Sequence, residues 1–310
     1  MLLGNATTSL DQNPRPSRKP LIPDQNSSSL GIVVSGGGTR SAYAVGALRA
    51  LAEIHHVKAP KVLVAMSGGA AAGTFYLAGR FNEMYDWARL FDDSRFISWK
   101  RLGRGPVMDI NFLVDQILRR QAPSLQRELA DVPTKCCIAA TKFPEGTLHW
   151  FEDEPLFEQL RATKTFPGIG GTVVKIGGSY YADGCLTASV EDCVEKAFKE
   201  GADTVVVIDN TSYDAIPAAV RTILLIEGRR TPTYVRRAIE KFCAENRKPN
   251  KPIEPTEKIY ICRPEHLPTK HGLVRSHALN YASIEQGYAD ASKLRFVRPP
   301  SYKLNFGHSQ

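Results

Sequence analysis

The sequence predicts a mixed α/β fold with a mainly parallel central sheet flanked by helices. Two apolar segments, residues 30–34 and 61–66, each run into a turn rich in glycine and are followed by a helical pattern. Strand, turn and helix thus occur twice within about fifty residues, which favours parallel strands joined by crossover helices. Residues 204–209 are rich in β-branched side chains and predict another buried strand.

The remaining elements follow from shorter patterns. Alternating or apolar segments predict strands at residues 136–141, 148–151, 173–176 and 179–182. The apolar periodicity after Arg40 predicts a helix there, and similar patterns predict helices at residues 110–119, 190–199 and 278–293.

The segment from about residue 213 to 255 interrupts the α/β alternation and predicts a helical cap inserted on the sheet. Its second amphipathic stretch places Val235, Ala238, Ile239 and Phe242 on one stripe, beside basic residues such as Arg236. This stripe either packs on its own domain or on a partner subunit in a homo-oligomer, or it dips into a membrane interface. We expect packing.

Composition limits the compartment and the partners. The 310 residues carry a net charge of +8, which favours an anionic membrane surface or nucleic acid. No nucleic-acid-binding motif is present, so we expect peripheral contact with anionic lipid and no nucleic acid. Six cysteines without a C-x-x-C pair, and no signal sequence, predict a cytoplasmic protein. We expect a flexible tail at residues 1–29, one domain at residues 30–295 and a C-terminal tail at residues 296–310.

The segment from Ala65 to Gly69 is typical of a nucleophile elbow. Ser67 follows an apolar strand and precedes a helix rich in alanine and glycine, as in a turn that projects a serine hydroxyl above a sheet. Gly68 and Gly69 allow the strand and the helix to approach closely. The alternative is a glycine turn in which Ser67 only caps the helix.

A second glycine-rich turn holds Gly36, Gly37 and Gly38, with Arg40 two residues later. Backbone N–H groups exposed at a helix N-terminus can stabilise the oxyanion that forms when an ester is attacked. The alternative, a phosphate-binding loop, fits neither the G-x-G-x-x-G nor the G-x-x-x-x-G-K-[ST] pattern.

A third motif, Asp183-Gly184, ends a predicted strand. Asp-Gly alone is a common turn and indicates no function. Together and in this order, however, the three motifs resemble the patatin-like phospholipase family, and the resemblance extends from about residue 30 to 293. Weaker similarities lie in residues 160–168, 201–203 and 286–290.

The resemblance implies a three-layer patatin-like fold and a specific chemistry. Ser67 would be the nucleophile and Asp183 its general base, with no histidine between them. The N–H groups of Gly37 and Gly38 would hold the oxyanion together with that of Gly68. Arg40 would hold this loop or meet a phosphate head group.

The sequence departs from the family pattern at several flanking positions. Ala65 replaces the first glycine of the elbow, and Cys185 replaces a small residue after Asp183-Gly184. Lys164 and Thr165 replace small serine or alanine residues before Pro167. These changes leave the three motifs in place, and we expect activity.

The implied function is hydrolysis of fatty acyl esters of phospholipids or lysophospholipids. One alternative is an α/β-hydrolase with a Ser-His-Asp triad, for which His266, His271 and His277 are available. Another is a catalytically impaired protein that binds lipid as a scaffold. None of the seven histidines has the spacing of metal ligands, so we expect no metal and no other cofactor.

Overall fold

The strands in the described part of the chain form one mixed sheet whose core strands are parallel. The computed structural model describes residues 29–269 and 272–295. The predicted C-terminal tail and, apart from Ser29, the predicted N-terminal tail lie outside these residues. The eight strands are β1 (Leu30–Val34), β2 (Val62–Met66), β3 (Lys135–Phe143), β4 (Thr147–Phe151), β5 (Val174–Ile176), β6 (Ser179–Asp183), β7 (Thr204–Ile208) and β8 (Ile259–Cys262).

The strand order is β5-β6-β3-β2-β1-β7-β8, with β4 also paired to β3. From β3 through β2, β1 and β7 to β8 every pair is parallel, whereas β4, β5 and β6 pair antiparallel. The predicted mainly parallel sheet is therefore confirmed. Strand β8 lies at the edge of the sheet and was not predicted.

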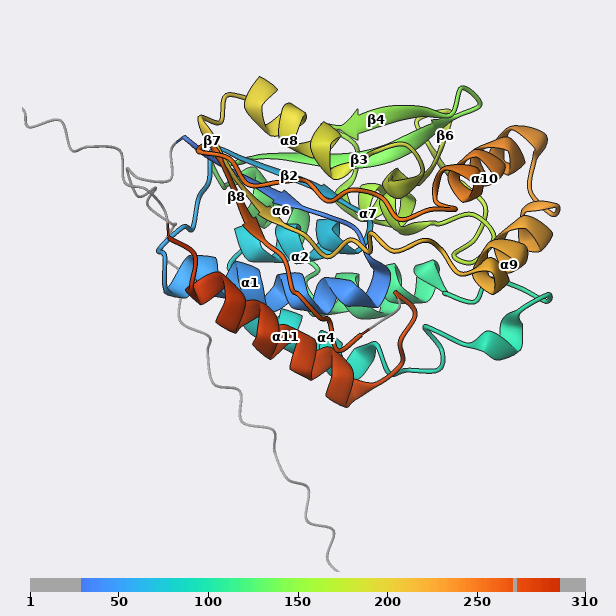
Figure 1. The fold of residues 1–310 in the computed structure, drawn as a ribbon, viewed down its shortest axis with the longest axis horizontal. Coiled ribbons are helices and arrows are strands. Elements are labelled where there is room, and N and C mark those ends of the chain that lie inside the picture. The colour runs from blue at the N-terminus through green and yellow to red at the C-terminus, as the bar shows by residue number, and fades with distance from the viewer. Residues whose placement is uncertain (1–28, 270–271, 296–310) are drawn as a thin grey trace, which may run out of the picture.

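The sheet lies between two layers of helices (Figure 1). Its side chains alternate between the two faces. Val33 and Val64 face α8 (Val190–Lys199), whereas Ile32 and Ala65 face the opposite helices. That second helical layer contains α1 (Ala42–Glu53), α2 (Ser67–Leu77) and α11 (His277–Ser292). Because both faces of β1 and β2 are covered, these two central strands carry no polar side chain, as expected for buried parallel strands.

The connection from β2 to β3 is a long helical excursion. It contains α3 (Phe81–Tyr85), α4 (Trp87–Leu90), the 3-10 helix η2 (Trp99–Arg101), the π-helix η3 (Phe112–Leu118), α5 (Arg119–Gln121) and α6 (Leu125–Ala130). The helix predicted at residues 110–119 is therefore present, largely with π geometry. Between β4 and β5 lies α7 (Leu156–Lys164), which was not predicted as a helix.

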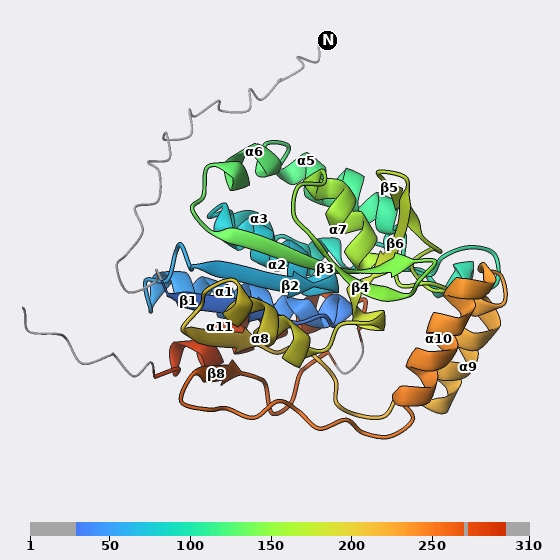
Figure 2. The ribbon, with the colours of Figure 1, turned by 90° about the horizontal axis from the view of Figure 1, so that it is seen from above.

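The inserted segment contains two helices, α9 (Ala218–Gly228) and α10 (Thr233–Glu245), at one end of the molecule (Figure 2). Val235 and Ile239 of α10 are fully buried and pack on Phe143 and Leu224. The apolar stripe of α10 thus packs on its own domain, in agreement with the expectation. None of the helices in the described part of the chain is long and apolar enough to cross a bilayer.

Candidate active site

Ser67 lies in a sharp turn between β2 and α2. Its φ angle is +50°, a value that a non-glycine residue adopts only when its surroundings enforce it. The side chain is buried, at 7% exposure, and its Oγ lies 2.8 Å from Oδ2 of Asp183. The turn therefore aims the hydroxyl at a carboxylate.

The small residues of the elbow are required by close packing. A Cβ at Gly68 would lie 2.6 Å from Oγ of Ser41 and 2.7 Å from the carbonyl oxygen of Gly38. Gly69 is packed as closely on the carbonyl groups at the end of β1. Ala65 has no exposed surface within β2. The first turn of α2 can thus lie directly against the glycine-rich loop.

The register of β3 brings Ser67 and Asp183 together across 116 positions of sequence. Met66, at the end of β2, lies opposite Ala139, and Asp183, at the end of β6, lies opposite Ala140. Strand β2 runs parallel to β3 and β6 runs antiparallel, so the two strands end beside consecutive residues. This geometry places the two side chains within hydrogen-bonding distance.

Asp183 is 3% exposed, and its carboxylate accepts hydrogen bonds from Ser67 and Cys185. Ser67 Oγ donates to Oδ2, and the backbone N–H of Cys185 donates to Oδ1 at 2.9 Å. Burial raises the pKa of Asp183 to about 6, although these hydrogen bonds and the ammonium group of Lys164 lower it. Gly184 is required here because a Cβ would lie 2.6 Å from the carbonyl oxygen of Ala139.

The glycine-rich loop joins β1 to the 3-10 helix η1 (Gly38–Ser41). Gly37 and Gly38 have φ angles of +150° and +59°, which favour glycine. Gly36 packs against Ser67 and Cys185, so this loop lines the nucleophile directly. Within the described hydrogen bonds, the N–H groups of Gly37 and Gly38 have no acceptor, which leaves them available to an oxyanion.

Arg40 connects this loop to the segment after β7. Its Nη2 donates to the carbonyl oxygen of Thr211 at 3.0 Å. Burial lowers the pKa of the guanidinium, whereas Asp209 and Asp214 raise it. In the same region the Ser35 hydroxyl accepts from the N–H of Asn210 at 2.7 Å. The ends of β1 and β7 therefore hold the base of the loop.

Helix α7 contributes two side chains that the motifs alone did not identify as site residues. Thr163 Oγ1 accepts a hydrogen bond from the N–H of Ser67 at 2.8 Å and donates to Ala139 at 2.7 Å. Lys164 Nζ donates to the carbonyl oxygen of Ser67. The only sequence signal for this role was the unusual lysine in a segment where the family has small residues.

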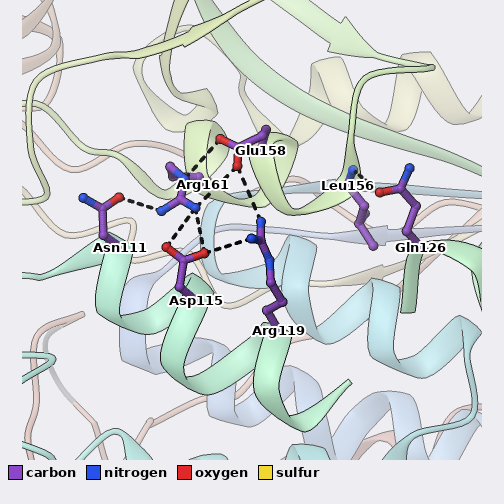
Figure 3. A network of polar contacts seen from close by, with 7 residues as sticks. All are labelled: Asn111, Asp115, Arg119, Gln126, Leu156, Glu158 and Arg161. Carbon is purple, nitrogen blue, oxygen red and sulfur yellow. Dashed lines mark hydrogen bonds and ion pairs between the residues drawn. The ribbon is translucent and has the colours of Figure 1, made fainter. Parts of the chain in front are cut away.

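A polar network fastens α7 to the helical excursion (Figure 3). Arg161 donates to Asn111 at 2.6 Å and to Asp115 at 2.9 Å, and it also pairs with Glu158. Arg119 lies 3.5 Å from both Asp115 and Glu158. Because Arg161 is mostly buried, its contacts fix α7 firmly relative to η3.

A cavity of about 1700 Å³ opens beside the Ser67–Asp183 pair. Ser67, Asp183 and the glycine-rich loop line one part of it. The rest is largely apolar and includes Phe91, Met108, Leu113, Phe166, Ile169 and Phe242. Its volume exceeds that of an ordinary small-molecule pocket and suits a ligand with long apolar chains.

The late histidines that the structure describes make no hydrogen bond with the Asp183 carboxylate. His266 is exposed at the edge of the cavity, and His277 begins α11. His271 lies outside the described residues. Among the residues that the structure describes, the carboxylate of Asp183 accepts hydrogen bonds from Ser67 and Cys185 and from no histidine.

Residues 32–191, slightly more than half of the chain, match the patatin-like phospholipase family. A comparison with curated proteins finds no match. Among solved structures, the chain is similar to VipD from Legionella pneumophila, with 11% sequence identity and a TM-score of 0.38. That similarity covers 85% of this chain and 66% of the VipD chain, so this chain spans less than two thirds of the length of that one.

Proposed function

The chain belongs to the patatin-like phospholipase family, and on this premise we propose that it is a serine lipid acyl hydrolase with a Ser67–Asp183 dyad. One observation carries the proposal: Ser67 Oγ lies 2.8 Å from Asp183 Oδ2 in the wall of a large apolar cavity. A hydroxyl with a buried base at this distance fits the geometry of an activated nucleophile.

In the proposed reaction, Ser67 Oγ attacks the ester carbonyl carbon while Asp183 Oδ2 takes the hydroxyl proton. The N–H groups of Gly37 and Gly38, with that of Gly68, stabilise the oxyanion. Asp183 then protonates the departing alcohol, which leaves an acyl group on Ser67. Water attacks this acyl-enzyme while Asp183 takes its proton, and Asp183 then returns that proton to Ser67 Oγ as the fatty acid leaves.

The pKa of Asp183 supports its role as the base. Burial raises this pKa to about 6, so the carboxylate is mostly ionised at neutral pH yet more basic than an ordinary aspartate. A general base is most effective when its pKa lies near the working pH. We expect the acid limb of kcat/KM to follow this ionisation.

We propose fatty acyl esters of phospholipids or lysophospholipids as substrates. Each methylene group buried in the apolar cavity contributes about 0.8 kcal/mol to binding. The net charge of +8 favours an anionic lipid surface, where the protein would bind peripherally. The exposed apolar side chains of α9, Val220, Leu225 and Ile226, lie at the cavity end of the molecule and are suited to this contact.

A fluorophosphonate probe tests the dyad. We expect the wild type to be labelled, Ser67→Ala to be unlabelled, and Asp183→Asn to be labelled much more slowly. Ser212→Ala is the matched control, because Ser212 lines the same cavity without contacting the dyad, and it should be labelled like the wild type. The same proteins should release fatty acid from phospholipid vesicles in the same order.

Two outcomes of this experiment would favour the alternatives. A folded wild type that is not labelled, but still binds anionic vesicles, would support the scaffold function. Loss of activity in His266→Ala, His271→Ala or His277→Ala would instead support a Ser-His-Asp triad.

A further inference from the structure

Lys164 is a charged residue buried in the wall of the candidate site. It is the last residue of α7, is 5% exposed, and lines the cavity beside Ser67. A buried ammonium group is unfavourable unless it is hydrogen-bonded or paired with an opposite charge. A lysine at this position therefore needs hydrogen-bond acceptors or a negative charge close to its ammonium group.

The first set of partners is the backbone of the elbow. Lys164 Nζ donates to the carbonyl oxygen of Ser67 and lies 3.4 Å from that of Gly68. The preceding residue, Thr163, accepts from the N–H of Ser67. Two consecutive side chains of α7 thus hold both polar groups of the Ser67 backbone, at the residue whose φ angle is +50°.

The Asp183 carboxylate is a neighbour of Lys164 rather than a hydrogen-bond partner. The backbone N–H of Asp183 donates to the carbonyl oxygen of Thr165, the residue after Lys164, at 2.9 Å, and both Lys164 and the Asp183 carboxylate bind Ser67. The negative charge nearest to the Lys164 ammonium belongs to Asp183 on β6, because burial raises the pKa of the Cys185 thiol and keeps that thiol neutral. Burial lowers the pKa of Lys164, and the Asp183 carboxylate raises it. Reciprocally, the ammonium lowers the pKa of Asp183, which burial raises. Lys164 therefore favours the ionised form of the carboxylate.

We propose that Lys164 is a positioning residue of the acyl-transfer site, which holds the carbonyl groups of the elbow and keeps the Asp183 carboxylate ionised. The proposal rests on the proposed roles of Ser67 and Asp183. It assigns a function to a residue that departs from the small side chains of the family at this position.

Two variants separate the two parts of this role. Lys164→Met removes both the donor and the charge with little change in length, whereas Lys164→Gln removes the charge but keeps an N–H donor. Lys199→Met, at an exposed site on α8, is the control. Thermal unfolding and near-UV circular dichroism establish that each variant is folded.

The first measurement is an NMR titration of the Asp183 carboxyl carbon in protein labelled with ¹³C-aspartate, with the signal assigned through Asp183→Asn. Both Lys164 variants should move its midpoint to higher pH, and Lys199→Met should not. This readout requires no catalysis, so it decides the electrostatic part even if the wild type proves inactive. An unchanged midpoint in both variants would overturn that part.

The second measurement is the rate of fluorophosphonate labelling against pH. Lys164→Met should be labelled roughly 10- to 100-fold more slowly at pH 7, because a loosened elbow misplaces the hydroxyl. Its acid limb should move to higher pH in parallel with the NMR midpoint. Lys164→Gln should show the same displaced limb with a faster plateau. If both folded variants were labelled at the wild-type rate, with the acid limb of the pH profile unchanged, the positioning role would be refuted.

Discussion

At the scale of single residues, the site holds two buried groups of opposite charge, Asp183 and Lys164. Burial raises the pKa of Asp183 to about 6 and lowers that of Lys164 to about 7. Each pKa moves in the direction that disfavours the charged form, so their mutual attraction does not fully offset the loss of hydration. The folded state is therefore less stable at neutral pH than it would be with a neutral pair.

This imbalance predicts that Asp183→Asn, which slows the proposed acyl transfer, stabilises the fold. The folded pKa of Asp183 lies above its unfolded value of 3.8, so ionisation favours the unfolded state. The gain in unfolding free energy should be absent below about pH 4, grow between pH 4 and 6, and reach roughly 2–3 kcal/mol above pH 6. Urea unfolding at several pH values measures it.

The exposed Asp153→Asn provides the control for this experiment and should show no such pH-dependent gain. A destabilised Asp183→Asn at pH 8 would mean that the carboxylate contributes more through its hydrogen bonds than it loses through burial.

At the scale of elements, α7 transmits the packing of the helical excursion to the nucleophile. Arg161 anchors this helix to Asn111 and Asp115 (Figure 3). Two residues further along the chain, Thr163 accepts a hydrogen bond from the Ser67 N–H. Arg161→Met would leave the Asp115 carboxylate with fewer donors and should lower the unfolding free energy by about 1–3 kcal/mol. Urea unfolding measures this loss.

The same variant should also slow fluorophosphonate labelling, because α7 supplies the contacts of the elbow. Arg236→Met, which breaks an ion pair of 3.8 Å on α10, is the control and should change stability by less than about 1 kcal/mol. Equal effects of the two substitutions would argue against a special role for the α7 anchor.

The elements differ in how far the sequence predicts them. Strands β1, β2 and β7 are central, so their uninterrupted apolar runs bounded by glycine or acidic turns identify them. Strand β8 has side chains that favour a strand, but it has only four residues at an edge, and a segment that short is identified as a strand only by its pairing with β7. Helix α7 is short and begins after Pro155, and its face is set by tertiary contacts.

The residues of the site also differ in how far the sequence predicts them. Ser67, Asp183 and the glycine-rich loop occur in local motifs, and the structure brings all of them to one cavity. The contribution of Lys164 could not be predicted from the sequence, because the sequence does not show whether a lysine ammonium group is buried or lies in water. Only the packing of α7 against the elbow reveals its partners.

At the scale of the whole molecule, the cavity end combines apolar and basic groups on its surface. Near the end of α9, Leu225 is 37% exposed and Ile226 is 50% exposed. The next residue, Glu227, is buried. Arg229 and Arg230 are exposed directly after this helix. An apolar helix face bordered by arginines suits a surface that inserts shallowly into anionic lipid.

This arrangement predicts that Ile226→Asp weakens binding to vesicles that contain anionic phospholipid. Full burial of an isoleucine side chain is worth about 1.5–3 kcal/mol, and the added charge repels the surface, so affinity should fall by roughly tenfold or more. Sedimentation with vesicles measures it.

Ile54→Asp is the control for this prediction. It carries the same charge change at a site of similar exposure, 47%, at the far end of α1 from the glycine-rich loop, and it should bind nearly like the wild type. Binding should weaken with salt, since exposed charges are screened. Equal binding of both variants, or equal binding to neutral vesicles, would rule out this face as the membrane contact.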